Sequence, residues 1–380
     1  MKNKKIIFLT GTRADFGKQK SLIESVYGHK DFEVYIFVTG MHLEKEYGYT
    51  FEEVKSNFPK NIIAFKNSKK NNSMDEILAN TILGFTKVVK EIIPDFVVVH
   101  GDRVEALAGA IVGALNNIRT LHIEGGERSG TIDESIRHSI SKLSHIHLVA
   151  NNEAMHRLRL LGEDEKSIFI IGSPDIDIMR SDKLPNFDKV LKHYEIPFKD
   201  YGILLFHPVT TNSKDLPKSV GNLVDSIIDS KKRFIVILPN NDLGTEIIQS
   251  EYKRFTKNEN IKVFPSIRFE YFLSLLKNSQ FIIGNSSAGI REAPFYGIPT
   301  INIGDRQSNR AEGESILNID FSKKQILEAI NNSLNKKFNT TRDFGDGTSD
   351  NRFLKLLEGD HFSNIKIQKN FIDFVSMNTL

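Results

Sequence analysis

Short runs of apolar, β-branched residues recur along the first half of the chain, and each is followed by a longer amphipathic stretch. Continuous apolar runs are typical of strands that are buried on both faces. Helices between such strands indicate a doubly wound parallel sheet. The predicted strands are Lys5–Leu9, Glu33–Val38, Phe96–His100, Arg119–Ile123, Ile146–Val149 and Ser167–Ile171. The predicted helices are Gly17–Tyr27, Asp75–Glu91, Arg103–Leu115, Glu134–Leu143 and Asn152–Leu161.

This rhythm breaks at Gly172–Asp200, which is rich in proline and polar residues, and a second series of strands and helices follows. The pattern predicts an α/β protein with two Rossmann-like parallel-sheet domains facing a cleft. We place the domains at residues 1–175 and 176–363, and expect residues 364–380 to form a helix that packs back on the first domain. The strands predicted in the second series are Gly202–Phe206, Arg233–Leu238, Ile261–Phe264, Gln280–Ile283 and Pro299–Ile303.

Composition narrows the protein class. The chain has 380 residues and no cysteine, which excludes disulfides and thiolate metal sites. The apolar run after the basic first residues is too short for a signal peptide, and no segment approaches the roughly 18–20 apolar residues that span a bilayer. We therefore expect a cytoplasmic protein without membrane contact. The net charge is only +3, which argues against a nucleic-acid partner.

The first predicted strand ends in Thr10-Gly11-Thr12-Arg13-Ala14-Asp15-Phe16-Gly17. A glycine turn that leads into a helix offers free N–H groups to an anion, and Arg13 and Lys18 add positive charge. The spacing does not match the GxGxxG fingerprint of dinucleotide sites. An ordinary strand-to-helix turn explains the same residues, and this segment alone does not separate the two interpretations.

Acidic residues follow two later strands. Asp102 lies in His100-Gly101-Asp102, Glu124 lies in His122-Ile123-Glu124, and Asp133 and Glu134 follow soon after. Neighbouring parallel strands lie about 5 Å apart, so these carboxylates are expected to converge. Carboxylates held close together suit acid–base chemistry on a carbon skeleton. The alternative is a set of solvated helix caps. The histidines of this half show no metal-ligand spacing, and we interpret them as structural.

The second half carries a candidate phosphate site. Ser286 and Ser287 follow a predicted strand and open a helix, and Glu292 lies one turn further on. His207 ends another strand, where it is placed to donate to a phosphate. Arg268 and Phe269 belong to a segment that we interpret as a slot for a base, although such aromatics are usually core. A plain helix cap is the alternative for the serines, and no Walker lysine motif is present.

Taken in order, these motifs resemble one family. GTRADFGK, HGDRVEALAGA, HIEGGERSGTIDESIRH, FHPVTT, PSIRFEYF and GNSSAGIREAPFYGIP resemble the hydrolysing UDP-N-acetylglucosamine 2-epimerases of bacterial sialic acid synthesis, from Lys5 to about Arg310. The related non-hydrolysing enzymes carry a DSGG-type loop and a TERPE-type stretch. This chain has Asn285-Ser286-Ser287-Ala288 and Arg306-Gln307-Ser308-Asn309-Arg310 there, which favours the hydrolysing branch.

The resemblance implies a glycosyltransferase-B fold and roles for single residues. Asp102, Glu124 and Asp133 with Glu134 would carry the chemistry, Arg13, Lys18 and His207 would lie near the nucleotide and its diphosphate, and Ser286, Ser287 and Glu292 would bind phosphate and ribose. It implies elimination of UDP to a glycal followed by hydration, with no metal or cofactor. UDP-N-acetylglucosamine and UDP would be the ligands, and the chain would form a homodimer or homotetramer.

Several alternatives stay open at this point. A glycosyltransferase of the same fold would keep the nucleotide loop but would need an acceptor. A regulatory module would bind the nucleotide sugar without turnover. The same reaction on UDP-N,N'-diacetylbacillosamine, or epimerisation without hydrolysis, would use a similar set of motifs. The division of acid and base roles among the carboxylates does not follow from the sequence.

Overall fold

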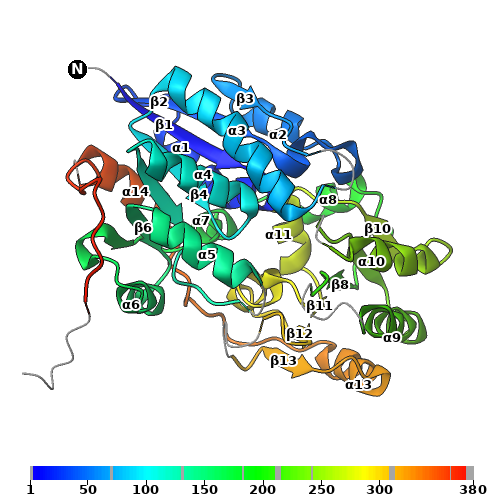
Figure 1. Cartoon of the computed structure of the whole chain (residues 1–380). Coiled ribbons are helices and arrows are strands. Elements are labelled where there is room, and N and C mark those ends of the chain that lie inside the picture. The colour runs from blue at the N-terminus through cyan, green and yellow to red at the C-terminus, as the bar shows by residue number, and fades with distance from the viewer. Residues whose placement is uncertain are drawn as a thin grey trace, which may run out of the picture. The chain divides into compact units, whose positions relative to one another are not determined.

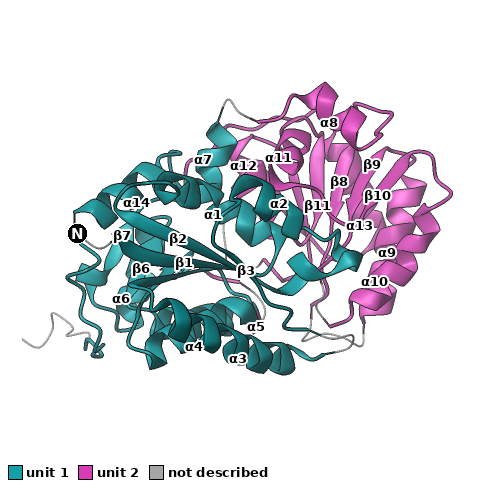
Figure 2. Cartoon of the chain, turned by 90° about the horizontal axis from the view of Figure 1, so that it is seen from above, with its two compact units in different colours: residues 1–127, 133–181, 343–380 teal, residues 128–132, 182–342 magenta. Residues whose placement is uncertain are grey.

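A computed structural model of the chain describes residues 3–68, 72–129, 132–181, 184–209, 215–240, 243–307, 313–359 and 361–373. It divides into two compact units (Figures 1 and 2). Unit 1 consists of Met1–Glu127, Asp133–Ser181 and Asp343–Leu380, and unit 2 consists of Arg128–Ile132 and Asp182–Arg342. Each unit contains one parallel sheet between helices, which confirms the predicted fold class.

Unit 1 is built on a seven-stranded sheet with the order β3-β2-β1-β4-β5-β6-β7, and every described strand pair is parallel. The strands are β1 Lys4–Thr10, β2 Phe32–Val38, β3 Ile62–Ala64, β4 Phe96–His100, β5 Arg119–Ile123, β6 Ile146–Val149 and β7 Ile168–Ile170. The helices are α1 Arg13–Val26, α2 Phe51–Asn57, α3 Met74–Ile92, α4 Val104–Leu115, α5 Ile132–Leu143, α6 Asn152–Leu160, α7 Pro174–Arg180 and α14 Ser349–Glu358.

Both faces of this sheet are buried, as the continuous apolar strands require. One face packs against α1 and α14, and Phe16, Leu22 and Phe353 lie in that core. The other face packs against α3, α4 and α5, with Phe85 and Ile140 among the buried side chains. Figure 2 shows these two helix layers on opposite sides of the strands. The order in which strands are added to the sheet reverses between β1 and β4, so this is the point of the sheet where ligands usually bind.

Unit 2 repeats the architecture with a six-stranded parallel sheet in the order β10-β9-β8-β11-β12-β13. Helices α9, α10 and α13 pack on one face around Leu204, Val236 and Ile301. The strands are β8 Gly202–Leu205, β9 Phe234–Ile237, β10 Ile261–Phe264, β11 Phe281–Gly284, β12 Thr300–Ile303 and β13 Ile316–Ile319. The helices are α8 Phe187–His193, α9 Leu216–Asp229, α10 Thr245–Tyr252, α11 Phe269–Lys277, α12 Glu292–Phe295 and α13 Lys323–Ser333.

The chain returns to unit 1 earlier than the sequence predicted. The predicted boundary was residue 363, but residues from Asp343 onward already belong to unit 1. The reason is α14, whose Phe353 and Leu357 are fully buried in the unit 1 core beside Phe8 and Val98. Amphipathic periodicity shows that a helix has a buried face, but it does not show which sheet that face covers.

The predicted helix over residues 364–380 is wrong for the residues that the structure describes. Residues 361–373 contain no α-helix, and residues 374–380 lie outside the described part. The segment does pack on unit 1, because the backbone of Ile365 accepts from Arg119 Nε at 2.9 Å and the amide of Ile372 donates to Gly162 O at 3.1 Å. Its backbone groups are thus satisfied by neighbouring elements rather than by a helical ladder.

A buried charge cluster holds this segment. Lys369 Nζ lies 2.6 Å from Glu163, and Glu163 also binds Lys142 at 2.8 Å and His147 at 2.9 Å. Burial alone would raise the pKa of Glu163, but the hydrogen bonds from His147 and Lys142 and the charge of Lys369 outweigh it and lower that pKa to about 2. The carboxylate of Glu163 is therefore stabilised in the folded protein.

This lowered pKa predicts acid sensitivity in a defined window. The stabilisation by Glu163 is complete above its ordinary pKa near 4.5 and is lost as the pH falls toward 2. Its size is on the order of 3 kcal/mol. Thermal melting of the wild type should therefore fall more steeply between these pH values than melting of Glu163→Gln. Glu165→Gln, at an exposed side chain nearby, should follow the wild type. Parallel pH profiles for the wild type and Glu163→Gln would contradict this prediction.

Candidate active site

The turn after β1 begins α1 four residues earlier than predicted. Thr12 caps the helix because its hydroxyl accepts from the Asp15 amide at 3.2 Å, and the Asp15 carboxylate accepts from the Thr12 amide at 3.2 Å. This reciprocal cap starts the helix at Arg13 rather than at Gly17. Burial raises the pKa of Asp15 to about 6, although hydrogen bonds from Thr10, Gly11 and Thr12 oppose that rise. Arg13 Nε lies 2.9 Å from Glu53 of α2.

The two principal carboxylates lie at neighbouring strand ends, as predicted. Asp102 follows β4 and Glu124 follows β5, and the two turns continue the sheet ladder, since Gly101 N donates to Ile123 O at 3.0 Å and Glu124 N donates to Leu148 O at 3.2 Å. Glu124 has a φ of 70°, a left-handed conformation that is uncommon for a residue with a side chain. Such local strain often marks functional positions.

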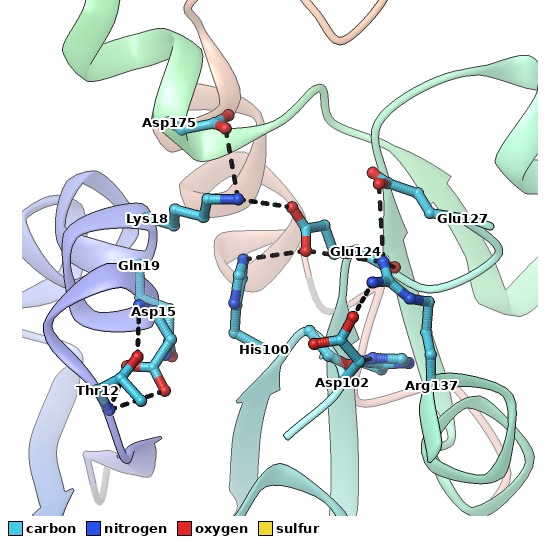
Figure 3. A network of polar contacts seen from close by, with 12 residues as sticks. Thr12, Asp15, Lys18, Gln19, His100, Asp102, Glu124, Glu127, Arg137 and Asp175 are labelled. Carbon is cyan, nitrogen blue, oxygen red and sulfur yellow. Dashed lines mark hydrogen bonds and ion pairs between the residues drawn. The ribbon is translucent and has the colours of Figure 1, made fainter. Parts of the chain in front are cut away.

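Arg137 of α5 joins these carboxylates. Its side chain is fully buried, and Nη2 donates to Asp102 Oδ2. Nη1 donates to the Glu124 carbonyl at 3.1 Å and lies 3.7 Å from Glu124 Oε2 and 3.6 Å from Glu127 Oε2. Figure 3 shows the guanidinium between Asp102 and Glu127, with Glu124 beside it. One rigid, permanently charged group thus fixes the side chain of Asp102 and the strained backbone of Glu124.

Lys18 and His100 approach Glu124 from the other side (Figure 3). Lys18 Nζ lies 3.2 Å from Glu124 Oε1 and 3.9 Å from Asp175 Oδ2, and His100 Nε2 lies 3.8 Å from Glu124 Oε2. All four of these side chains are at least nine-tenths buried, whereas the Asp102 side chain is 24% exposed. Asp102 is therefore the carboxylate of this cluster that is open to a small molecule.

The acidic pair of α5 is placed differently from Asp102 and Glu124. Asp133 lies one turn before Arg137 and so shares its helix face, and it is partly exposed. Glu134 Oε1 lies 3.7 Å from His138 Nε2 on the same helix. The structure therefore brings Asp102, Glu124 and Lys18 together, and it places Glu134 beside His138.

In unit 2, His207 and Asn285 form the centre of a second candidate site. The amide of His207 donates to Asn285 Oδ1 at 2.7 Å, and Asn285 Nδ2 donates to His207 O at 2.8 Å. His207 follows β8 and Asn285 follows β11, which are neighbouring strands on either side of the reversal in strand order. The carbonyl of Asn285 accepts from Arg306 at 3.1 Å and from Gln307 at 2.9 Å. Ligands of open α/β sheets bind at this position.

The other predicted residues of unit 2 surround this centre or lie beside it. Ser286 caps a short 3₁₀ turn, Ser287–Gly289, by accepting from the Ala288 amide at 3.3 Å. Glu292 is buried at the start of α12. Phe269 is buried core, and Arg268 is exposed, with its guanidinium 5.8 Å from the Tyr271 ring. Of the quoted motifs, Gly130, Thr131, Thr210, Thr211 and the stretch Ser308–Arg310 lie outside the described residues.

The described residues support neither a metal site nor a membrane span. Among them, no group of His, Asp and Glu side chains is arranged to hold a metal ion. His147 binds Glu163, and His122 binds Ser141 Oγ at 3.0 Å and Gly101 O at 2.8 Å, so both have structural partners. No helix in this part of the chain is long and apolar enough to cross a bilayer.

Two Rossmann-like units, each with polar side chains at the strand ends beside its reversal point, define an enzyme architecture for nucleotide-linked substrates. Residues 24–358 match the family model for UDP-N-acetylglucosamine 2-epimerase, and the chain belongs to this family.

Individual relatives agree with this assignment. The chain is 48% identical to a UDP-N-acetylglucosamine 2-epimerase of Neisseria meningitidis serogroup B, over 97% of this chain and 99% of the relative. It is 33% identical to the UDP-N,N'-diacetylbacillosamine 2-epimerase (hydrolyzing) of Legionella pneumophila, over 93% of this chain and 96% of the relative. A solved Neisseria meningitidis UDP-GlcNAc 2-epimerase bound to UDP-GlcNAc has a similar fold, with a TM-score of 0.78 at 20% identity over 93% of this chain and all of that one.

The sequence did not single out Arg137, Glu127 or Asn285. Arg137 stands four residues after Asp133, within the motif that carried the resemblance, and a basic residue on the buried face of an amphipathic helix is a signal for a paired charge. Asn285 stands directly before the two serines that were chosen. The serines were chosen because hydroxyl groups at the start of a helix suit phosphate binding. The role of Asn285 depends on its hydrogen bonds to His207, which follows another strand, and the sequence does not show that contact.

Proposed function

We propose that this chain hydrolyses UDP-N-acetylglucosamine with inversion at C2, releasing UDP and N-acetylmannosamine for sialic acid synthesis. The observation that carries the proposal is the pair of carboxylates, Asp102 and Glu124, held by one buried guanidinium at adjacent strand ends. Moving a proton at C2 needs groups that give and accept protons at fixed positions. The hydrolysing course is supported by the likeness to a relative whose name includes hydrolysis and by the loop sequence around Ser286.

The C1–O bond breaks with its electron pair leaving on UDP, and positive charge that develops at C1 makes the C2 proton removable. A carboxylate takes that proton and a C1=C2 glycal forms. Water then adds its hydroxyl to C1, and a carboxyl group delivers a proton to C2 on the opposite face. We assign these proton transfers to Asp102, Glu124 and Asp133.

The cations of unit 1 support this chemistry. Lys18, within 3.2 Å of Glu124, keeps a positive charge beside one carboxylate, and Arg137 does the same beside both. Fixed charges that need no rearrangement during the reaction lower the barrier more than mobile ones. We therefore assign Lys18 to the carboxylate cluster as well.

The uridine diphosphate is assigned to unit 2. His207, Ser286 and Ser287 follow β8 and β11, and the paired hydrogen bonds between His207 and Asn285 fix the two turns in one geometry. Helix-like turns at strand ends present backbone N–H groups to phosphate oxygens. Glu292 is assigned to the ribose hydroxyls.

Gly284 provides a test of this assignment. Its φ is 137°, and a Cβ there would lie 2.0 Å from Leu205 O on β8. Gly284→Ala should therefore push β11 away from β8, cost about 1–3 kcal/mol of unit 2 stability and weaken UDP binding. Isothermal titration with UDP and thermal melting measure both effects.

Gly221→Ala is the matched control, because a Cβ at Gly221 of α9 meets nothing within 4 Å. This replacement should leave UDP affinity unchanged and raise stability by up to about 1 kcal/mol, as alanine favours the helix. Equal UDP affinity for Gly284→Ala and the wild type would contradict the assignment of UDP to this strand end.

Proton NMR of the purified chain with UDP-N-acetylglucosamine in deuterated water tests the proposed reaction. We expect UDP together with free N-acetylmannosamine that carries deuterium at C2. Interconversion of the two UDP-sugars without UDP release would show the non-hydrolysing reaction instead. A glycosyltransferase would give no acceptor-free N-acetylmannosamine, and a regulatory module would give no product at all.

One relative points to a second candidate substrate. The Legionella relative is named for UDP-N,N'-diacetylbacillosamine, and its match covers almost the whole chain. Because the identity to the Neisseria relative is higher, we propose the N-acetylglucosamine nucleotide as the substrate. Parallel assays with the two UDP-sugars compare kcat/KM directly. A higher value for the diacetylated sugar would make that UDP-sugar the proposed substrate.

A further inference from the structure

Lys369 of segment 361–373 reaches the end of α5, the helix that carries Arg137. Its ammonium donates to Lys142 O at 2.9 Å, to Ser141 O at 3.2 Å and to Ser144 O. The last carbonyls of a helix have few partners within the helix and lie at the negative end of its dipole. Lys369 therefore caps α5, and its pairing with the buried Glu163 keeps the ammonium at that position.

From the capped end, a defined set of hydrogen bonds leads to Asp102. Ser141 Oγ lies 3.0 Å from His122 Nδ1, and His122 Nε2 lies 2.8 Å from Gly101 O, the carbonyl directly before Asp102. Burial lowers the pKa of His122 to about 3, so the ring is neutral and has one donor and one acceptor. A carbonyl can only accept, so Nε2 donates to Gly101 and Nδ1 accepts from Ser141.

The contact between His122 and Ser141 is closely packed. A Cβ on Gly125 would lie 3.0 Å from both His122 Nδ1 and Ser141 Oγ. Helix α5 thus contacts the Gly101–Asp102 turn at two points along its length. Ser141 reaches Gly101 through His122, and Arg137, one turn earlier in the helix, binds Asp102 directly. A displacement of the α5 end moves both connections together.

We propose that Lys369 is a positioning residue for the reaction assigned above: by capping α5 it sets, through Ser141 and His122, where the Asp102 carboxylate stands. This inference rests on the proposed function for its kinetic consequence, but the coupling itself is a property of the free protein. Lys369 acts from a segment more than 200 residues away in sequence from the helix that it caps.

Lys369→Met tests the coupling, because methionine keeps most of the length of the side chain without its charge. We expect kcat for UDP release to fall about tenfold with KM changed less than about twofold, since a small misplacement of a reacting group lowers the rate of the chemical step. Hydrogen–deuterium exchange of the free protein should become faster at the amides of Gly101–Arg103 and at the end of α5. Lys369→Arg, which keeps the charge, should restore most of both properties.

Lys366→Met is the matched control, because Lys366 is an exposed residue of the same segment. It should match the wild type in kcat and in exchange. Unchanged kcat and unchanged Gly101–Arg103 exchange in Lys369→Met, or an equal loss in Lys366→Met, would overturn the proposal. If Lys369→Met does not fold, Ser141→Ala decides the question by the same two readouts, and wild-type behaviour of that variant also overturns it.

The exchange readout separates the two proposals. If the wild type releases no UDP from the nucleotide sugar, the proposed function fails, yet faster exchange at Gly101–Arg103 in Lys369→Met still supports the coupling. If the wild type turns over and the exchange of Lys369→Met is unchanged, the positioning role fails and the proposed function stands.

Discussion

Replacing Asp102 with asparagine is expected to lower kcat by about 10²- to 10⁴-fold, the usual range for loss of a proton-transferring group. The amide keeps an oxygen that accepts from Arg137, and the side chain is 24% exposed, so folding should be little affected. Binding of the nucleotide should persist, because UDP is assigned to unit 2. The measurement is the rate of UDP release together with deuterium incorporation at C2.

Asp31→Asn is the control for this variant, because it makes the same chemical change in unit 1 at a side chain that is 59% exposed. It should keep the wild-type kcat. If Asp102→Asn retained a kcat within a few-fold of the wild type, Asp102 would have no part in proton transfer, and the assignment of the chemistry to this cluster would have to be abandoned.

The second large effect is expected at Arg137. Arg137→Lys keeps a positive charge but replaces a planar fork with a single ammonium, which cannot reach Asp102 Oδ2 and the Glu124 carbonyl together. We expect kcat to fall by about 10²-fold, because both carboxylates lose their fixed positions. Arg137→Met removes the charge altogether and leaves Asp102, Glu124 and Glu127 without it, which should cost about 3–5 kcal/mol of unit 1 stability.

Steady-state kinetics and urea denaturation measure these two consequences separately. Arg159→Lys is the matched control, since Arg159 pairs with Glu165 at the surface and its side chain is 46% exposed. It should change neither kcat nor the urea midpoint. A wild-type kcat in Arg137→Lys would show that a positive charge alone is sufficient for catalysis, and that the forked geometry of the guanidinium is not needed.

The sequence predicted the central strands well. Phe96–His100, Arg119–Ile123 and Ile146–Val149 match the structure residue for residue, because a strand buried on both faces leaves an uninterrupted apolar run. The edge strands β3 and β13 were missed. Ile62–Ala64 has only three residues and Ile316–Ile319 is interrupted by Asn318, so neither forms the longer uninterrupted apolar run that marks a buried strand.

Part of the candidate active site was also predicted from the placement of the strands. Asp102 and Glu124 follow strands that were correctly placed, and parallel neighbours bring such residues together without further information. Lys18 was predicted to lie near the nucleotide from its positive charge and from the family resemblance, and this stays a prediction. Its pairing with Glu124 was not predicted, because it depends on α1 beginning at Arg13, which places Lys18 in the second turn. Arg137 required knowledge of how α5 packs, which periodicity does not supply.

Unit 1 is assembled from stretches of chain that leave the ribosome at different times. Its sheet is complete in sequence by Ile170, but Phe353 and Leu357, which are buried in its core, are synthesised only after the whole of Asp182–Arg342 has emerged. Unit 2 is continuous over that stretch and has its own core, so it is able to fold during translation. Until α14 arrives, the sheet of unit 1 has an incomplete apolar face that is prone to associate with other chains, which is the period when a chaperone would be of most use to this protein.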